Sequence, residues 1–131
     1  NITPYSNTGA EISFAAPGGN TRIKNGGILQ ETIRSGKHEF IAYQGTSMAS
    51  PHVAGALAML LSEGSGSPTN ALETLQNTAL DLGTKGKDET YGYGLIQLQD
   101  SIDHTRYTEK GGRFLMAGSI MLSLAQNGQE R

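Results

Sequence analysis

The chain has 131 residues, a formal net charge of −2, 17% charged residues, 18 glycines and no cysteine. This length suits one domain or a piece of a larger one. The charge gives no indication of nucleic acid or an anionic membrane as partner, and the absence of cysteine excludes a disulfide scaffold and thiolate metal sites.

The first predicted elements are a turn and a short strand. Residues 4–9 (Pro-Tyr-Ser-Asn-Thr-Gly) have the composition of a turn. Residues 11–16 follow, with Ile12 and Phe14 on one face, which predicts a strand. Residues 17–19 (Pro-Gly-Gly) end it.

The next stretch leads to a serine. Residues 20–38 are polar and rich in glycine, which predicts a surface loop, with Ile28, Leu29 and Ile33 as candidates for a short strand or for anchors. Residues 39–44 (Glu-Phe-Ile-Ala-Tyr-Gln) predict a strand that delivers the serine at the carboxyl end of a sheet, the edge where ligands bind in open α/β sheets.

A central helix is predicted for residues 46–63, with Thr46 as N-cap and Gly64 as its stop. Residues 53–61 are uncharged and apolar on every face, which is typical of a helix in the middle of a protein. Ser47 would then lie in the first turn, where free N–H groups and the helix dipole favour negative charge.

A second helix is predicted to begin at Ser67 and Pro68 and to end by Gly83. Its expected apolar stripe consists of Leu72, Leu75, Ala79 and Leu82. A charged loop over 85–90 and a short helix over 100–104 are predicted to follow.

Residues 45–55 (Gly-Thr-Ser-Met-Ala-Ser-Pro-His-Val-Ala-Gly) resemble the nucleophile signature of the subtilisin-like serine proteases, the subtilases. A string of this length is far more specific than a bare G-x-S-x-[GA]. Residues 6–9, the strand after them and residues 16–18 (Ala-Pro-Gly) resemble the way in which subtilases approach that serine, and residues 91–98 resemble the element that closes their domain.

The resemblance implies an α/β three-layer fold with a parallel sheet and a buried central helix, present here only as its C-terminal part. It implies that Ser47 is the catalytic nucleophile and that its backbone N–H is an oxyanion donor. The implied reaction is hydrolysis of protein or peptide substrates through an acyl-enzyme, outside the cell or at its surface. Many subtilases also hold structural calcium, but no cluster of metal ligands stands out in this sequence.

The general base that the resemblance requires has no counterpart before Ser47. In subtilases an Asp and a His precede the serine, but here no Asp occurs before Asp81, and the only earlier His is His38, in the predicted loop. The asparagines Asn7, Asn20 and Asn25 do not match the context of the family's side-chain oxyanion donor. We therefore expect the chain alone to be inactive, with the N-terminal half of the domain as a possible separate partner. The alternative is a catalytically inactive scaffold or partner subunit.

Two further histidines follow the serine. His52 is five residues after Ser47 on the predicted helix, so it points to a different side and is expected to be structural. The order Ser47, then Asp81 or Asp88, then His104 is that of the α/β-hydrolases, which leaves an esterase using Ser47 with His104 as a minor alternative.

The resemblance covers residues 3 to about 103, so we divide the chain into 1–103, the C-terminal part of a subtilase catalytic domain, and 104–131, an extension. Within that extension, residues 114–125 are apolar but shorter than the ~20 residues needed to cross a bilayer. They predict an added amphipathic helix or the start of a further element, and they do not favour a membrane anchor.

Overall fold

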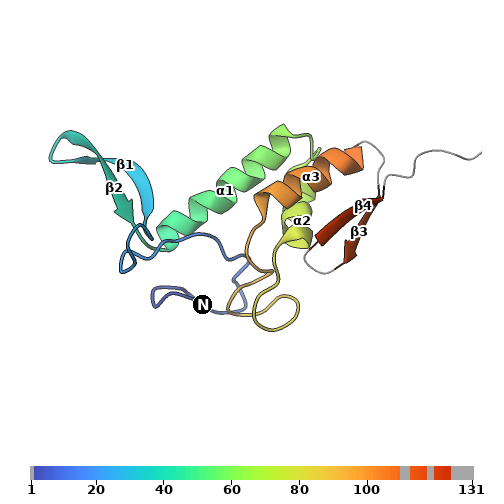
Figure 1. The fold of residues 1–131 in the computed structure, drawn as a ribbon, viewed down its shortest axis with the longest axis horizontal. Helices are drawn as coiled ribbons and strands as arrows, with labels where there is room; N and C mark the ends of the chain where they lie inside the picture. The colour runs from blue at the N-terminus through green and yellow to red at the C-terminus, as the bar shows by residue number, and fades with distance from the viewer. Residues whose placement is uncertain (1, 110–112, 118–119, 125–131) are drawn as a thin grey trace, which may run out of the picture.

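The structure is a computed structural model that describes residues 2–109, 113–117 and 120–124. Helices and strands are mixed in the described part, as in an α/β fold (Figure 1). In chain order they are β1 (Ile28–Arg34), β2 (Lys37–Tyr43), α1 (Thr46–Ser62), α2 (Pro68–Thr78), α3 (Leu98–Glu109), β3 (Arg113–Ala117) and β4 (Ile120–Leu124).

Strands β1 and β2 form an antiparallel hairpin, with Ile28 opposite Tyr43 at its base and Arg34 opposite Lys37 at its tip. The two residues of the turn, Ser35 and Gly36, have φ of 51° and 76°, the signature of a type I′ turn that matches the twist of a hairpin. The strand expected over 39–44 is confirmed as β2. Its partner β1 lies in the stretch predicted as a surface loop, where Ile28, Leu29 and Ile33 were candidates for a short strand. Such short apolar positions between polar ones give only a weak strand signal.

The strand predicted for residues 11–16 is wrong as an extended strand. Only Phe14 and Ala15 pair, through single bridges to Gly92 and, in parallel, to Leu95. The segment that contains Gly92 and Leu95 does not continue beside Phe14 and Ala15 as a strand, because Gly92 and Gly94 have φ of 61° and 118°. In the described residues this is the one parallel pairing, since β1–β2 and β3–β4 are antiparallel.

Helix α1 ends where the sequence predicts, at Gly64. This glycine has φ 96°, its N–H donates to the carbonyl of Leu61 at 3.2 Å, and the N–H of Ser65 donates to that of Leu60 at 3.0 Å. Together these bonds form a Schellman motif, which satisfies carbonyls that a helix end leaves free.

Helix α2 begins as predicted, because the Ser67 hydroxyl accepts the N–H of Asn70 at 3.1 Å and Pro68 follows it. Its predicted apolar stripe is only partly right. The helix ends at Thr78, so Ala79 and Leu82 lie beyond it. Its buried residues are Ala71, Leu75 and Thr78, whereas Leu72 is 37% exposed.

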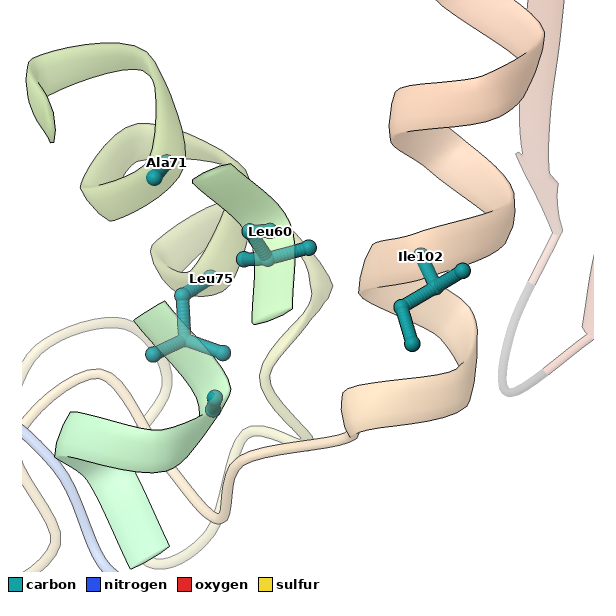
Figure 2. Packing of buried hydrophobic residues seen from close by; sticks show 5 residues of the cluster. Leu60, Ala71, Leu75 and Ile102 are labelled. Atoms are coloured by element: carbon teal, nitrogen blue, oxygen red, sulfur yellow. The ribbon is translucent and has the colours of Figure 1, made fainter. Parts of the chain in front are cut away.

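The core lies where α1 meets α2 and α3 (Figures 1 and 2). It consists of Ala56, Leu60, Ala71, Leu75 and Ile102.

The residues described here bury only one side of α1. Leu60 is fully buried, whereas Met59 and Leu61 beside it are each 43% exposed. The apolar sequence predicts that α1 is buried on every face. In the structure, the apolar surface on its other side has no cover within the described part of the chain.

Helix α3 is longer than predicted and is tied to the end of α1 by an ion pair. Arg106 donates through Nε and Nη2 to the two carboxylate oxygens of Glu63, at 2.6 and 2.9 Å. This two-bond geometry fixes the angle between the helices better than a single contact would. The proposed division after residue 103 falls inside α3.

The amphipathic helix expected over residues 114–125 is not what the structure has. The described residues of that stretch form β3 and β4, which pair with Ala117 opposite Ile120. Gly118 and Ser119 interrupt the apolar run with turn composition, which favours two short strands over one helix. None of the helices described is both long and apolar enough to cross a membrane.

Truncation of the central core residue, Leu60→Ala, is expected to lower the free energy of unfolding by about 2–5 kcal/mol, because it leaves a cavity between the helices. Leu61→Ala, at the exposed neighbouring position, is the matched control and should cost about 1 kcal/mol or less. Urea unfolding of both variants checks this, and equal losses would contradict the assignment of the core.

The loop before α3 depends on an ionised Asp88. Its carboxylate accepts the N–H groups of Tyr91, Thr90 and Thr84 at 2.7, 2.8 and 2.9 Å, and these bonds hold the pKa of Asp88 below its ordinary value. A lowered folded-state pKa contributes stability that is present above about pH 4 and is lost as the pH falls through the folded value. Urea midpoints measured from pH 7 to pH 2 should therefore fall less steeply for Asp88→Asn than for the parent below pH 4.

Candidate active site

Ser47 lies at a sharp corner between β2 and α1. Strand β2 ends at Tyr43, Gly45 is the N-cap of α1 with φ 148° and ψ 169°, and Ser47 is the exposed second residue of the helix. The prediction of Thr46 as N-cap is wrong. The chain turns at Gly45, in a conformation that L side chains rarely adopt, and no side chain caps the helix.

The first turn of α1 presents free amides at this corner. The N–H groups of Met48 and Ala49 donate to the Gly45 carbonyl at 3.0 and 3.3 Å. Within the described residues, the N–H groups of Thr46 and Ser47 have no acceptor. With the helix dipole behind them, these amides favour a negative charge beside the Ser47 hydroxyl.

The segment that contains the Ala-Pro-Gly motif (residues 16–18) contacts the corner through Gly45. Gly45 donates its N–H to the Gly18 carbonyl at 2.8 Å, and the Tyr5 hydroxyl donates to the Gly19 carbonyl. A Cβ added to Gly18 would lie 2.8 Å from the Tyr5 hydroxyl and 3.0 Å from the Gly45 carbonyl oxygen. In the sequence Gly18 stands out only as part of the Ala-Pro-Gly motif, and Tyr5 does not stand out at all, because its role depends on a contact between residues far apart in the chain.

No histidine of the described residues contacts Ser47. His52 donates from Nδ1 to the carbonyl of Met48 one turn earlier, at 2.7 Å, which supports its structural reading. His38 lies on β2 rather than in a loop, and its Nδ1 is 2.9 Å from a carboxylate oxygen of Glu31, with both side chains exposed.

The residues of the α/β-hydrolase alternative are not brought together. His104 lies on α3, two residues before the Arg106 that binds Glu63, at the opposite end of α1 from Ser47. The two ends of this helix are roughly 24 Å apart at 1.5 Å per residue. Asp81 instead accepts the N–H of Gly86 at 2.8 Å. Burial lowers the pKa of His104, so its imidazole is neutral near pH 7, but it has no access to the serine.

Two of the three asparagines singled out in the sequence serve the local structure of the loop before β1. Asn20 accepts the N–H of Arg22 at 3.1 Å, and Asn25 has φ 60° within the same loop. Across the part of the chain that the structure describes, no three His, Asp or Glu side chains lie close enough to share a metal ion. We therefore assign no calcium site to these residues.

A cavity of about 500 Å³ lies beside the first turns of α1. Its walls come from residues 2–19, from α1 residues such as Ala49 and Val53, and from the loop that contains Tyr91 and Leu95. Ser47 does not line it. The cavity is therefore a gap in the packing beside the serine rather than a pocket around it.

The sequence model of the subtilase family (Peptidase_S8) matches residues 1–94, which include the corner, the serine and the loop that pairs with Phe14. The chain belongs to the subtilase family.

Curated subtilases resemble the chain over most of its length. Subtilisin of Bacillus pumilus is 40% identical over 97 residues, which are 72% of this chain and 30% of that protein. The minor extracellular protease Epr of Bacillus subtilis (strain 168) is 34% identical over 108 residues, 81% of this chain and 15% of Epr. The chain thus spans less than a third of the length of these relatives.

A solved structure confirms the fold. The crystal structure of a lanthipeptide protease matches with a TM-score of 0.71 and 32% identity, covering 79% of this chain and 38% of that one. The chain therefore has the α/β fold of the subtilisin-like serine proteases, present in part. The family resemblance of residues 45–55 is confirmed, while the role of Ser47 stays a prediction.

Proposed function

We propose that Ser47 is the nucleophile of a serine-type endopeptidase that hydrolyses peptide bonds in protein substrates. The observation that carries this proposal is the placement of an exposed serine hydroxyl on the first turn of a helix, next to its own free N–H, in a chain of the subtilase family.

The chemistry follows from that placement. A base removes the proton of Ser47 Oγ, and the oxygen attacks the carbonyl carbon of the scissile bond. The resulting oxyanion accepts the Ser47 N–H, and removal of one such donor typically lowers turnover by about 10²–10³. The intermediate then collapses, the amine leaves with a proton returned by the base, and water hydrolyses the acyl-serine and frees the hydroxyl.

The base and its orienting carboxylate are supplied by residues outside this chain. His38, His52 and His104 are each engaged elsewhere or remote from Ser47, so none of the described histidines meets the geometric requirement for a base. The complementing segment would cover the exposed apolar surface of α1 and fill the cavity beside Val53. Burying that surface would stabilise the complex by about 25 cal/mol for each Å² removed from water.

An extracellular or cell-surface location fits this proposal, because similar proteins are named extracellular proteases. The substrate class is a protein or peptide, and the net charge of −2 gives no reason to add a nucleic acid.

The test is complementation. We would co-express this chain with the part of Bacillus pumilus subtilisin that precedes the matched region, and measure hydrolysis of fluorescent casein by each fragment alone and by the purified complex. We expect hydrolysis by the complex only, with no hydrolysis by the chain alone. Full activity of the chain alone would place the base within it. A folded complex that fails to hydrolyse casein would instead favour the inactive scaffold.

A further inference from the structure

The Tyr5 hydroxyl reaches the corner before Ser47 from a distant part of the chain. Tyr5 is a half-buried residue of a turn in which Pro4 precedes it, an arrangement that proline favours. The N–H of Ser6 donates to the Thr3 carbonyl at 3.0 Å, and the hydroxyl oxygens of these two residues are 3.1 Å apart. This turn places the Tyr5 ring so that its hydroxyl donates to the carbonyl of Gly19, 14 residues farther along.

The carbonyl that Tyr5 binds is next to the carbonyl that binds the corner. Gly18 accepts the N–H of Gly45 at 2.8 Å, and Gly19 follows it directly. Gly18 also lies between the two partners, because a Cβ there would be 2.8 Å from the Tyr5 hydroxyl and 3.0 Å from the Gly45 carbonyl oxygen. Two adjacent glycines, the second with φ 80°, rotate more freely than any other pair. The Tyr5 hydroxyl therefore restricts the most flexible point of this segment.

Gly45 in turn sets the start of α1. Its carbonyl accepts the N–H groups of Met48 and Ala49 at 3.0 and 3.3 Å, so its orientation determines how the first turn begins. Ser47 lies within that turn. A rotation at Gly45 would therefore displace both the Ser47 hydroxyl and the Ser47 N–H.

Another attachment of the same segment is open to solvent. The side-chain oxygen of Gln44 accepts the N–H and the hydroxyl of Thr21 at 2.7 and 2.9 Å, and both residues are exposed. Water can replace a lost partner at such a place, which keeps the net contribution of these bonds small. The bond from Tyr5 to Gly19 is partly buried, so solvent compensates its loss less well.

We propose that Tyr5 is a positioning residue for the nucleophile. It acts through the backbone of Gly18, Gly19 and Gly45 rather than through a contact with the substrate, and this inference rests on the proposed function of Ser47. A displacement of about 1 Å in a reacting group can lower a rate by about 10². Loss of one bond that fixes the corner indirectly should give part of that effect, in kcat and not in KM.

The test in the complemented protease is Tyr5→Phe, which removes only the hydroxyl. We expect kcat for fluorescent casein to fall about tenfold and KM to stay within a factor of about two. Tyr93→Phe is the matched control, because the Tyr93 ring contacts Phe14 and Lys87 while its hydroxyl makes no hydrogen bond within the described residues. A kcat that Tyr5→Phe leaves unchanged, or an equal loss in Tyr93→Phe, would overturn the proposal.

Amide hydrogen exchange in the full 131-residue chain, followed by NMR, measures the same link without catalysis. In Tyr5→Phe the N–H of Gly45 should exchange at least about fivefold faster, whereas the N–H of Leu60, in the buried part of α1, should keep its rate. Unchanged exchange at Gly45 would also overturn the proposal. Faster exchange at Gly45 together with a parent complex that fails to hydrolyse casein would refute the proposed function and leave the link from Tyr5 to the corner in place.

Discussion

Replacing Ser47 with alanine is expected to lower casein hydrolysis by the complemented protease by about 10⁶, the scale of the loss when subtilisin, a member of the same family, loses its nucleophile. The hydroxyl is the atom that forms the acyl-enzyme, so no neighbouring group can replace it. The loss should appear in kcat, with little change in KM, because the hydroxyl contributes to the transition state far more than to substrate binding.

The matched control is Ser50→Ala. Ser50 is also an exposed serine of the first turns of α1, three residues farther along, and it lines the cavity rather than the corner. Its replacement should leave kcat within a factor of about three, because its side chain lies on the wall of the cavity and not at the reacting hydroxyl. A similar loss in both variants would mean that substitutions in this turn damage the fold, and it would remove the support for Ser47 as nucleophile.

Replacing Gly94 with alanine is expected to prevent stable folding, at roughly 3–5 kcal/mol. Gly94 has φ 118°, and a Cβ there would lie 2.2 Å from the backbone oxygen of Leu80. That contact is between backbone atoms at the point where Leu80 and Leu95 exchange hydrogen bonds of 2.8 and 2.9 Å, so neither side can move without breaking them. Thermal unfolding followed by circular dichroism measures the loss.

Gly86→Ala separates backbone strain from this collision. Gly86 has φ 84° but open space around its Cα, so alanine there should cost only about 1–2 kcal/mol. If the two alanine variants unfold at the same temperature, the close approach of residues 80 and 94 is not a determinant of the fold.

Sequence alone predicted the features that depend on local chemistry. Gly64 and the Ser67–Pro68 pair mark helix ends because positive φ, a capping hydroxyl and a missing N–H act within one turn. The family of the chain was predicted correctly for a similar reason, since residues 45–55 form one contiguous motif.

Features that depend on distant residues were missed. The bridge of Phe14 to Gly92 and the contact of Tyr5 with Gly19 are set by tertiary packing, which single positions in the sequence do not reveal. Strand β1 was only partly foreseen for another reason, since its few apolar positions between polar ones give a weak strand signal. The exposure of Met59 was also not foreseen, because an apolar helix predicts burial without saying which residues provide the cover.

The most direct measurement is labelling with a fluorophosphonate, which forms a stable adduct only with a serine that a base has activated. We would treat the chain alone and the complemented complex, digest both with trypsin, and locate the adduct by tandem mass spectrometry in the peptide of residues 38–85. The account predicts an adduct on Ser47 in the complex, none in the chain alone, and none in the complex with Ser47→Ala. An adduct on Ser47 of the chain alone, or a folded and proteolytically active complex labelled at another serine, would contradict it.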